Sequence, residues 1–368
     1  MKTILFYISN LKRGGAQRVF STLCNHFART YQVILLTTAY GESSYELHPS
    51  IQLLSLDASS EAVLENKIIK NIRRNKRMLE IVDTYAPAVI ITFLEREIFR
   101  ILYIRKQITA PVIVSFRNDP QVDYASIIPR LSINWLIKRA DGIVFQTPDA
   151  KKFFLGRYQC NDTIIPNPLN PAFLIERDIQ QRDTRIVTVG KLFPQKNHAL
   201  LIQSFATIAE EFPNYTLEIF GEGDLREPLQ TLIHELALDS RVFLRGIKSN
   251  IEEYLLDASM FVLSSDYEGV SNALIEAMAL GLPVISTDCP CGGSAMLIDD
   301  GVNGLLTPVG DKQALASAMR KMILDKSFSQ KLGNRAKEVR EIVHPQAVFS
   351  LWESYIHEVI KSQPGRTK

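Results

Sequence analysis

Residues 260–278 read MFVLSSDYEGVSNALIEAM, and this stretch contains the three parts of one α/β unit. Met260 to Leu263 are four apolar residues in a row, which is typical of a buried parallel strand that is apolar on both faces. A loop with Glu268 and Gly269 follows. Apolar residues then recur at helical spacing from Ser271 onward. A strand, a loop and a helix in this order predict part of a parallel sheet.

The same alternation continues on both sides of this stretch. Helices are expected at about 197–211, 225–238, 249–257 and 271–280, and the chain after Asp311 is expected to be mainly helical to about Lys361. The strands expected in this half of the chain are Arg185–Val189, Tyr215–Phe220, Arg241–Leu244, Met260–Leu263 and Pro283–Ser286. Strands and helices that alternate in this way predict a doubly wound parallel sheet.

The first half of the chain predicts a second sheet of the same kind. Its expected helices include Ala16–Ala28, Ala62–Tyr85 and Ile128–Lys138. Its expected strands are Lys2–Ser9, Val33–Thr37, Ala88–Thr92, Val112–Phe116, Gly142–Phe145 and Thr163–Ile165. A proline-rich loop at 166–171 interrupts the pattern and is the best domain boundary. We therefore expect an α/β protein with a first domain at 1–166, a second at 167–343 and a C-terminal segment at 344–368.

Composition supports a folded protein with two domains. The chain has 368 residues, of which 46% are hydrophobic and 22% are charged, too apolar for a disordered chain and long for one core. Residues 1–166 contain 22 Lys and Arg against 14 Asp and Glu, whereas the remainder contains 20 against 26. This asymmetry indicates domains with different partners, although chance variation among exposed faces stays an alternative.

Four cysteines without a C-x-x-C pair favour a reducing compartment, and no apolar run is long enough to span a membrane. We expect a cytoplasmic protein.

Glycine and lysine residues follow two of the expected strands, at the carboxyl ends where open α/β sheets bind ligands. Gly14 and Gly15 follow the first strand and allow a ligand to approach the backbone closely. Lys191 and Lys196 flank a short loop between Gly190 and an expected helix. Two ammonium groups beside a helix N-terminus suit a pyrophosphate. Ordinary tight turns and a solvated basic loop are the alternative interpretations.

The loop at 264–276 combines carboxylates with backbone donors. Glu268 is expected in the loop, Gly269 to Asn272 at the start of the helix, and Glu276 four residues later on the face of Asn272. Such a loop could hold a sugar hydroxyl, a phosphate and a ribose together, whereas two surface glutamates are the alternative. The Gly221-Glu222-Gly223 turn is not a dinucleotide fingerprint, because Arg226 stands at the third glycine position.

The order and spacing of these motifs resemble family 4 glycosyltransferases of the glycosyltransferase B fold over nearly the whole chain. The fold expected from this resemblance is two Rossmann-like domains that face each other across a cleft, with a C-terminal helix at about 344–361 that crosses back to the first domain. The motifs that carry the resemblance are Gly14-Gly15-Ala16-Gln17-Arg18, Ile165-Pro166-Asn167-Pro168, Val189-Gly190-Lys191-Leu192 with Lys196, Gly221-Glu222-Gly223, Glu268 with Glu276, Cys289-Pro290-Cys291-Gly292-Gly293 and Asp300-Gly301-Val302-Asn303-Gly304-Leu305-Leu306.

The resemblance also implies roles for individual residues. Lys191 and Lys196 would bind the donor diphosphate, Glu268 would contact the transferred sugar, and these three form the expected catalytic set. Glu276 would hold the ribose hydroxyls. The donor site would be completed by Gly15, Gly190, Gly221, Ile247, Gly269, Val270, Ser271 and Asn272. Arg117 and Asn118 are assigned to the side of the acceptor or the sugar.

Three positions depart from the family pattern. Lys191 stands where many members have arginine, which keeps the charge and loses the bidentate fork. Met296 stands where members often have glutamate, three residues after the paired glycines. Arg117-Asn118-Asp119-Pro120 occupies the strand end where a histidine near the sugar is common. These departures concern the choice of sugar or acceptor.

The expected reaction transfers a sugar from a nucleoside-diphosphate sugar to a hydroxyl acceptor and retains the anomeric configuration. The expected donor is a UDP-sugar. We expect a hexosyltransferase of polysaccharide or lipid-linked glycan synthesis. No D-x-D sequence occurs, so we expect neither a metal nor a cofactor. A nucleotide-sugar epimerase of the same fold and a non-catalytic sugar-nucleotide-binding protein are the alternatives. A nicotinamide dehydrogenase is disfavoured by the missing third glycine, and nucleic-acid binding by the lack of a recognisable module.

Residues 66–79 suggest contact with a membrane. At helical spacing, Ile68, Ile69, Ile72 and Leu79 can share one side while six cations spread around the rest. This pattern suits a helix that lies on anionic lipid. An amphipathic helix packed on its own sheet is an equally good interpretation, because every surface helix needs an apolar stripe.

Overall fold

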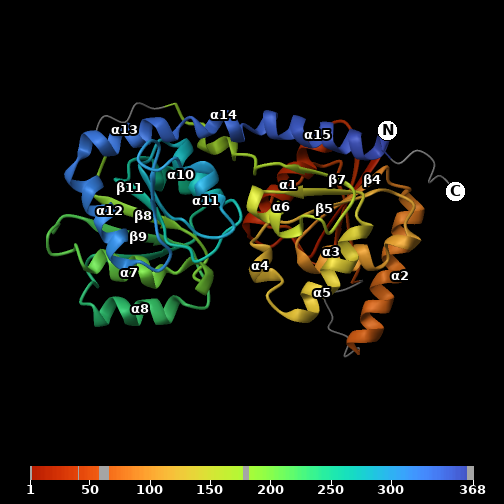
Figure 1. Ribbon diagram of the computed structural model, residues 1–368, viewed down its shortest axis with the longest axis horizontal. Coiled ribbons are helices and arrows are strands. Elements are labelled where there is room, and N and C mark those ends of the chain that lie inside the picture. The colour runs from red at the N-terminus through yellow and green to blue at the C-terminus, as the bar shows by residue number, and fades with distance from the viewer. Residues whose placement is uncertain (1, 40, 58–65, 177–181, 363–368) are drawn as a thin grey trace. The chain divides into compact units, whose positions relative to one another are not determined.

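The computed structural model describes residues 2–39, 41–57, 66–176 and 182–362. The chain forms two compact units, Met1–Asn167 with Gln346–Lys368 and Pro168–Pro345. Each unit is a parallel β-sheet with helices on both faces, as Figure 1 shows. The predicted class, two doubly wound α/β sheets, is confirmed.

The first unit contains a sheet of seven parallel strands in the order β3-β2-β1-β4-β5-β6-β7. Its strands are β1 (Thr3–Ile8), β2 (Gln32–Thr37), β3 (Gln52–Ser55), β4 (Val89–Phe93), β5 (Val112–Ser115), β6 (Gly142–Phe145) and β7 (Asn161–Ile164). All residues of β1, β4, β5 and β6 are buried, because helices cover both faces of the sheet. This burial explains the unbroken apolar runs in the sequence.

The helices of this unit divide between the two faces. They are α1 (Gly15–Phe27), α2 (Lys67–Tyr85), α3 (Glu95–Tyr103), α4 (Pro120–Asp123), α5 (Ile127–Leu136), α6 (Pro148–Phe154) and α15 (Pro345–Lys361), with 3₁₀ turns at Arg105–Gln107 and Ile137–Arg139. α1 and α15 share one apolar core with β1, and Figure 1 shows α2, α3 and α5 on the opposite side of the sheet.

The C-terminal helix α15 belongs to the first unit, as predicted from the family resemblance. Trp352 is fully buried in the core that α15 shares with α1. The Tyr355 hydroxyl accepts a hydrogen bond from Ile143 N at 2.7 Å and donates to Asn161 O at 2.6 Å. A Cβ atom at Gly142 would lie 2.8 Å from Val359 Cγ2, so only glycine lets the helix pack this closely.

The second unit contains six parallel strands in the order β10-β9-β8-β11-β12-β13. Its strands are β8 (Arg185–Val189), β9 (Thr216–Phe220), β10 (Val242–Gly246), β11 (Met260–Leu263), β12 (Val284–Thr287) and β13 (Leu305–Thr307). Its helices are α7 (His198–Ala206), α8 (Arg226–Glu235), α9 (Ile251–Leu256), α10 (Asn272–Ala279), α11 (Gly293–Leu297), α12 (Lys312–Leu324), α13 (Lys326–Ala336) and α14 (Val339–Val343), with 3₁₀ turns at Pro171–Phe173 and Pro194–Lys196. One core joins the sheet to α7, α8 and α12, and the other joins it to α10 and α14.

Two parts of the structure differ from the sequence prediction. The edge strands β3 and β13 were not predicted. α2 begins at Lys67, directly after its N-cap residue Asn66, and the predicted residues 62–65 lie outside the described part of the chain. The apolar stripe of α2 is divided. Met78, Ile81 and Val82 are buried, whereas Ile68, Ile69 and Ile72 are 69%, 56% and 63% exposed. The second half of α2 therefore packs within its own unit, whereas the isoleucines of the first half are uncovered, and contact with a membrane stays a prediction.

Candidate functional site

In the second sheet, the order in which the chain adds its strands reverses between β8 and β11. After β8 the chain adds β9 and β10 on one side, and it then returns to add β11, β12 and β13 on the other. The carboxyl ends of these two neighbouring strands, β8 and β11, form the switch point, which is where open α/β sheets bind their ligands. The predicted Lys191 and Lys196 follow β8, and the predicted Glu268 follows β11. The topology thus brings the two motifs to one place.

The loop after β11 holds the Glu268 side chain inside the protein. Glu268 is 7% exposed, and its Oε1 accepts a hydrogen bond from Ser265 Oγ at 2.9 Å. Its backbone is fixed as well, because Glu268 N donates to Pro290 O at 2.7 Å and Cys291 N donates to Glu268 O at 3.0 Å. The carboxylate consequently has a defined position before any ligand arrives.

The turn before α7 is tied to this loop by three consecutive residues. Lys196 Nζ forms an ion pair with Glu268 Oε1. Gln195 Nε2 donates to Tyr267 O at 3.0 Å, and Asn197 Nδ2 donates to Asp266 Oδ1 at 2.7 Å. Asn197 has a left-handed backbone conformation (φ 43°), and its side chain also accepts from Leu200 N, so one residue both turns the chain and caps α7. The structure therefore places a lysine and a glutamate in contact at the switch point.

Lys191 lies apart from this pair. Its side chain is exposed, and its ammonium nitrogen lies 5.6 Å from the centre of the Phe193 ring. His198 Nε2 lies 3.3 Å from the carbonyl oxygen of Lys191. Burial and the nearby Lys196 lower the pKa of His198 to about 4, so the ring is neutral at physiological pH. Because a carbonyl only accepts, Nε2 carries the proton, and His198 fixes the backbone of Lys191. The sequence analysis assigned His198 no role.

Glycines allow the loops at this end of the sheet to approach one another. A Cβ atom at Gly221 would lie 1.8 Å from Gly190 O, and one at Gly293 would lie 1.6 Å from Gly269 O. Neither distance is sterically allowed, so the loops after β8, β9, β11 and β12 need these glycines to pack. Of the predicted residues, Gly221 is thus explained by backbone packing, whereas a Cβ atom at Gly190 would meet only the Lys196 side chain, at 3.3 Å. Contact of Gly190, Gly221 and Gly269 with a ligand stays a prediction for each.

The remaining donor-site residues lie on or near α10. Asn272 begins the helix, and Glu276 lies one turn later and is 4% exposed. Val270 and Ser271 are buried before the helix starts. A carboxylate that is buried in the first turns of a helix can accept hydrogen bonds from neighbouring hydroxyl groups. Ile247, in contrast, is 51% exposed in the loop that follows β10.

The first unit has its own switch point, between β1 and β4. A pocket of about 400 Å³ lies there and contains both predicted residues of this unit, Arg117 and Asn118. Its lining comes from the ends of β1, β4 and β5, from the starts of α1 and α3, and from the end of α4: Ser9, Asn10, Ala16, Leu94, Glu95, Arg96, Glu97, Ile98, Phe116, Arg117, Asn118, Asp123 and Tyr124. Gly15 starts α1 directly beside Ala16. Polar groups at three strand ends make this pocket a second candidate binding site.

Arg117 is an unusual member of this lining. Its guanidinium carbon lies 3.8 Å from the centre of the Phe93 ring, and Nη1 donates to Asn167 Oδ1 at 3.0 Å. Nε and Nη2 are enclosed, and neither has a hydrogen-bond partner among the described residues. Burial lowers the pKa of Arg117 to about 9, and the group still carries its charge at neutral pH. Two unsatisfied donors on a cation favour an anionic partner.

Carboxyl groups in the same pocket were missed by the sequence analysis. Burial raises the pKa of Glu97 to about 7 and the pKa of Asp123 to about 6. Asn118 Nδ2 donates to Asp123 Oδ1 at 2.8 Å. Before Glu97, Leu94 has a positive φ of 71° that turns the chain from β4 into α3. The position of Glu95 and Glu97 directly after an expected strand was the available signal.

The buried Glu97 gives a prediction for stability. In the unfolded chain its carboxyl loses its proton near pH 4.5, whereas in the folded chain it does so near pH 7. The folded state binds more protons between these values, so rising pH lowers the free energy of unfolding there. We expect the stability of Glu97→Gln relative to wild type to increase between about pH 5 and about pH 8. Urea unfolding at both pH values measures this. An equal difference at the two values would contradict it.

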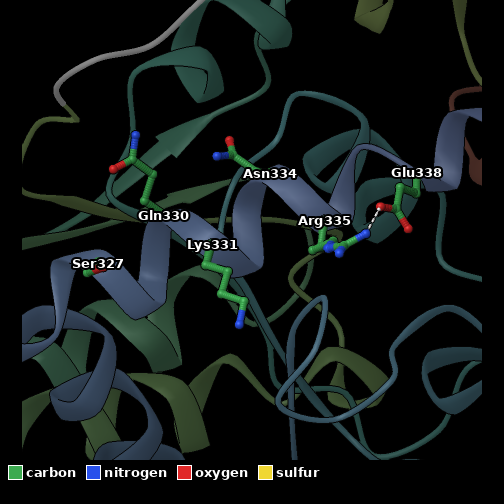
Figure 2. Close-up of a pocket in the computed structure, with 6 residues that line it drawn as sticks. All are labelled: Ser327, Gln330, Lys331, Asn334, Arg335 and Glu338. Atoms are coloured by element: carbon green, nitrogen blue, oxygen red, sulfur yellow. Dashed lines mark hydrogen bonds and ion pairs between the residues drawn. The ribbon is translucent and has the colours of Figure 1, made fainter.

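Another hollow, of about 450 Å³, lies along α13 in the second unit. Figure 2 shows its lining side chains, which project from one side of the helix, and the hydrogen bond from Arg335 to Glu338. None of the predicted site residues lies there.

Within the described residues, no group of three or more His, Cys, Asp or Glu side chains is placed to hold a metal ion. No helix in the described ranges is long and apolar enough to cross a membrane.

Comparison with protein families gives two matches. The family described as "Glycosyltransferase Family 4" matches residues 13–173, and the family described as "Glycosyl transferases group 1" matches residues 174–339. The two matches meet between the two sheets and together cover both switch points. They also contain each of the predicted site residues.

Individual relatives extend this similarity to the full chain. The N-acetylgalactosamine-N,N'-diacetylbacillosaminyl-diphospho-undecaprenol 4-alpha-N-acetylgalactosaminyltransferase of Campylobacter jejuni is 28% identical, over 92% of this chain and 94% of its own length. A second Campylobacter jejuni enzyme, an alpha-1,4-N-acetyl-D-galactosaminyltransferase also named for a PP-undecaprenol glycan, is 24% identical, over 98% of this chain and 99% of its own. Anabaena HepE, solved in complex with UDP, has the same fold, with a TM-score of 0.81, 16% identity and coverage of 97% and 100%.

Proposed function

Because this chain belongs to the family 4 glycosyltransferases of group 1 type, we propose that it transfers a hexose from a UDP-sugar to a hydroxyl group with retention of configuration. The observation that carries the proposal is the contact between Lys196 and Glu268 at the switch point of the second sheet. Ligands of doubly wound sheets bind at this position. A cation and a carboxylate there supply one group for a diphosphate and one for a sugar.

The chemical step follows from this arrangement. The bond from the anomeric carbon to the diphosphate breaks, and the acceptor oxygen forms its bond on the same face of the sugar. A β-phosphate oxygen takes the acceptor proton, so no protein base is needed. Negative charge grows on the leaving diphosphate, and Lys196, with Lys191 nearby along the loop, stabilises it. Glu268 orients the sugar through its hydroxyl groups.

The rest of the second unit holds the nucleotide. Glu276 accepts hydrogen bonds from the ribose hydroxyls, and the backbone amides at Gly269 to Asn272 contact the phosphates at the start of α10. Nothing in this scheme requires a metal ion, because the lysines neutralise the diphosphate. Retention, the UDP donor and metal independence are parts of the proposal that donor and product assays can test separately.

The pocket of the first unit is proposed to bind the acceptor. Its supporting features are the charged Arg117 with two unsatisfied donors and the carboxyl groups of Glu97 and Asp123. The cation suits a phosphate group, and the carboxyl groups suit sugar hydroxyls. A glycan linked to a lipid diphosphate contains both. The named acceptors of the two Campylobacter jejuni relatives end in diphospho-undecaprenol, which supports this choice. We place the reaction at the cytoplasmic face of a membrane.

A donor screen tests the proposed function. The full chain would be incubated with UDP-, GDP- and ADP-hexoses, with and without an undecaprenyl-diphosphate-linked glycan. The expected result is release of UDP from one class of donor, which the acceptor accelerates. A rearranged sugar formed without acceptor would identify an epimerase. Binding of the donor without any turnover would identify a non-catalytic sugar-nucleotide-binding protein.

Contact of α2 with anionic lipid is part of the proposal. Ile68, Ile69 and Ile72 are exposed beside several cations. Some of those cations hold the fold and are poor choices for mutation, because Arg74 pairs with Asp57 at 2.6 Å and lowers the pKa of that carboxyl. Lys67 and Lys76 are exposed and suit a test.

Lys67→Gln combined with Lys76→Gln should weaken binding to anionic vesicles. Each cation near an anionic surface contributes about 1 kcal/mol, so the pair predicts a loss of about 30-fold. Vesicle sedimentation measures the loss, and Lys312→Gln with Lys331→Gln, two exposed lysines of the second unit, is the matched control. Equal sedimentation of both variants would show that α2 does not contribute to membrane binding.

A further inference from the structure

Helix α5 exposes an apolar face that the preceding account does not use. Ile127, Ile128, Leu131 and Trp135 are 74%, 78%, 65% and 59% exposed. Their spacing of three, four and seven residues places them on one side of the helix. The opposite side is buried through Ile133 and Leu136. A helix that is already anchored by one apolar face gains nothing in folding from a second one, so the exposed face indicates a binding surface.

The charged residues of α5 and of the segments directly before and after it are all positive. Residues 124–140 contain Arg130, Lys138 and Arg139 and neither Asp nor Glu. The Arg139 guanidinium carbon lies 3.8 Å from the centre of the Trp135 ring, and its Nη1 donates to the carbonyl oxygens of Leu102 and Tyr103, both at 3.2 Å. Arg139 is thus fixed beside the exposed tryptophan without a carboxylate partner among the hydrogen bonds of the described residues.

A lipid surface fits this face better than a second copy of the chain. In a twofold interface each face meets an identical face, so the cations would oppose cations. An anionic bilayer supplies the opposite charge for these cations and an apolar layer for the isoleucine and leucine side chains. Tryptophan prefers the boundary between the two layers, and Trp135 stands next to Arg139 at the end of the apolar row.

We propose that α5 inserts its apolar face into the interface of an anionic membrane, with Ile128 and Leu131 among the acyl chains and Trp135 at their boundary. The helix then lies parallel to the membrane, because its buried face holds it against its own unit. This role differs from that of α2, where Lys70, Arg73 and Arg74 all lie within 3.8 Å of Asp57. Part of the charge of α2 is therefore already paired inside the protein. The inference rests on one part of the proposed function, the attachment to a membrane. It can be tested with vesicles alone, in the absence of donor and acceptor.

Tryptophan fluorescence tests the insertion directly. The chain has two tryptophans, and Trp352 is fully buried in the first unit. On addition of vesicles of phosphatidylglycerol and phosphatidylcholine, we expect a blue shift that comes from Trp135. Lipids with brominated acyl chains should quench this signal, and Trp135→Phe should abolish both effects. The same vesicles without phosphatidylglycerol should give a much smaller shift.

A second variant tests the apolar side chains themselves. Ile128→Gln with Leu131→Gln should weaken sedimentation with anionic vesicles by about tenfold or more, because two buried side chains leave the apolar layer. Leu324→Gln with Ile342→Gln is the matched control, since these residues of the second unit are 66% and 58% exposed. Both variants should keep the unfolding midpoint of the wild type.

The outcomes separate this inference from the others. Sedimentation with vesicles without a change in Trp135 fluorescence would overturn the role of α5 and leave attachment through α2. A dimer that Ile128→Gln with Leu131→Gln dissociates would show that the face binds a second copy, which also overturns the inference. Absence of vesicle binding by the wild type would overturn both membrane proposals, whereas UDP release in the donor screen would still support the proposed transferase.

Discussion

Lys196→Ala is expected to lower turnover by about 10²–10³-fold, with a smaller change in donor affinity. The reason is that the negative charge of the diphosphate grows as the bond to the sugar breaks, so its stabilisation is greater in the transition state than in the bound donor. In the free protein, Glu268 holds the ammonium group of Lys196 at the switch point. Initial rates across donor concentrations measure the two effects separately.

Controls must separate catalysis from folding in this experiment. Removal of one partner of a partly buried ion pair destabilises a protein, because the other charge stays behind. We therefore include Lys196→Ala with Glu268→Gln, which removes both charges, and compare unfolding midpoints. Lys312→Ala is the matched surface control, since this exposed lysine begins α12 and is not among the predicted site residues. A raised Michaelis constant with normal turnover for Lys196→Ala would contradict the proposed role.

Glu276→Ala is expected to weaken UDP binding by about 10- to 150-fold, which corresponds to about 1.5–3 kcal/mol for hydrogen bonds to a charged group. The side chain is 4% exposed and lies one turn into α10, and we propose that it meets the ribose hydroxyls. Calorimetry with UDP measures the change. Glu276→Gln keeps one acceptor oxygen and should show a smaller loss.

The ligand can also be altered to match the mutation. If Glu276 binds the ribose, the wild type should prefer UDP to 2′,3′-dideoxy-UDP, and Glu276→Ala should bind the two with nearly equal affinity. This cycle isolates the contact between the carboxylate and the hydroxyls from general damage to the site. An undiminished preference for UDP in the variant would assign the ribose to another residue.

The sequence predicted the central strands of both sheets well, because helices cover both of their faces. Met260–Leu263 and Gly142–Phe145 form strands with the predicted bounds. The edge strand β3 was missed because it is short and half exposed, so it lacks the apolar run by which the others were recognised. β13 has only three residues, too few for a periodic pattern.

The candidate site was predicted in part. Lys191, Lys196 and Glu268 were identified by their positions after strands. Their positions in the sequence predicted the same role for the two lysines. Lys196 contacts Glu268, which lies 72 residues later, whereas Lys191 is exposed. This difference depends on β8 and β11 being neighbours, and the order of strands in a sheet is not encoded in local sequence.

The pocket of the first unit shows the same limitation. Arg117 and Asn118 were assigned from the family resemblance, because they occupy the strand end where a histidine near the sugar is common. The enclosed donors of Arg117 and the buried Glu97 depend on packing among three strand ends. The exposure of Ile68 and Ile128 could not be predicted either. An apolar stripe on a helix has the same sequence pattern whether another part of the protein covers it or not.

The anomeric configuration of the product tests the central claim most directly. The full chain would be incubated with the UDP-α-hexose selected by the donor screen and with the undecaprenyl-diphosphate-linked glycan, and the new linkage would be assigned by NMR. The account predicts an α-glycoside and one UDP released for each sugar transferred. A β-glycoside, or a rearranged nucleotide sugar without UDP release, would contradict it.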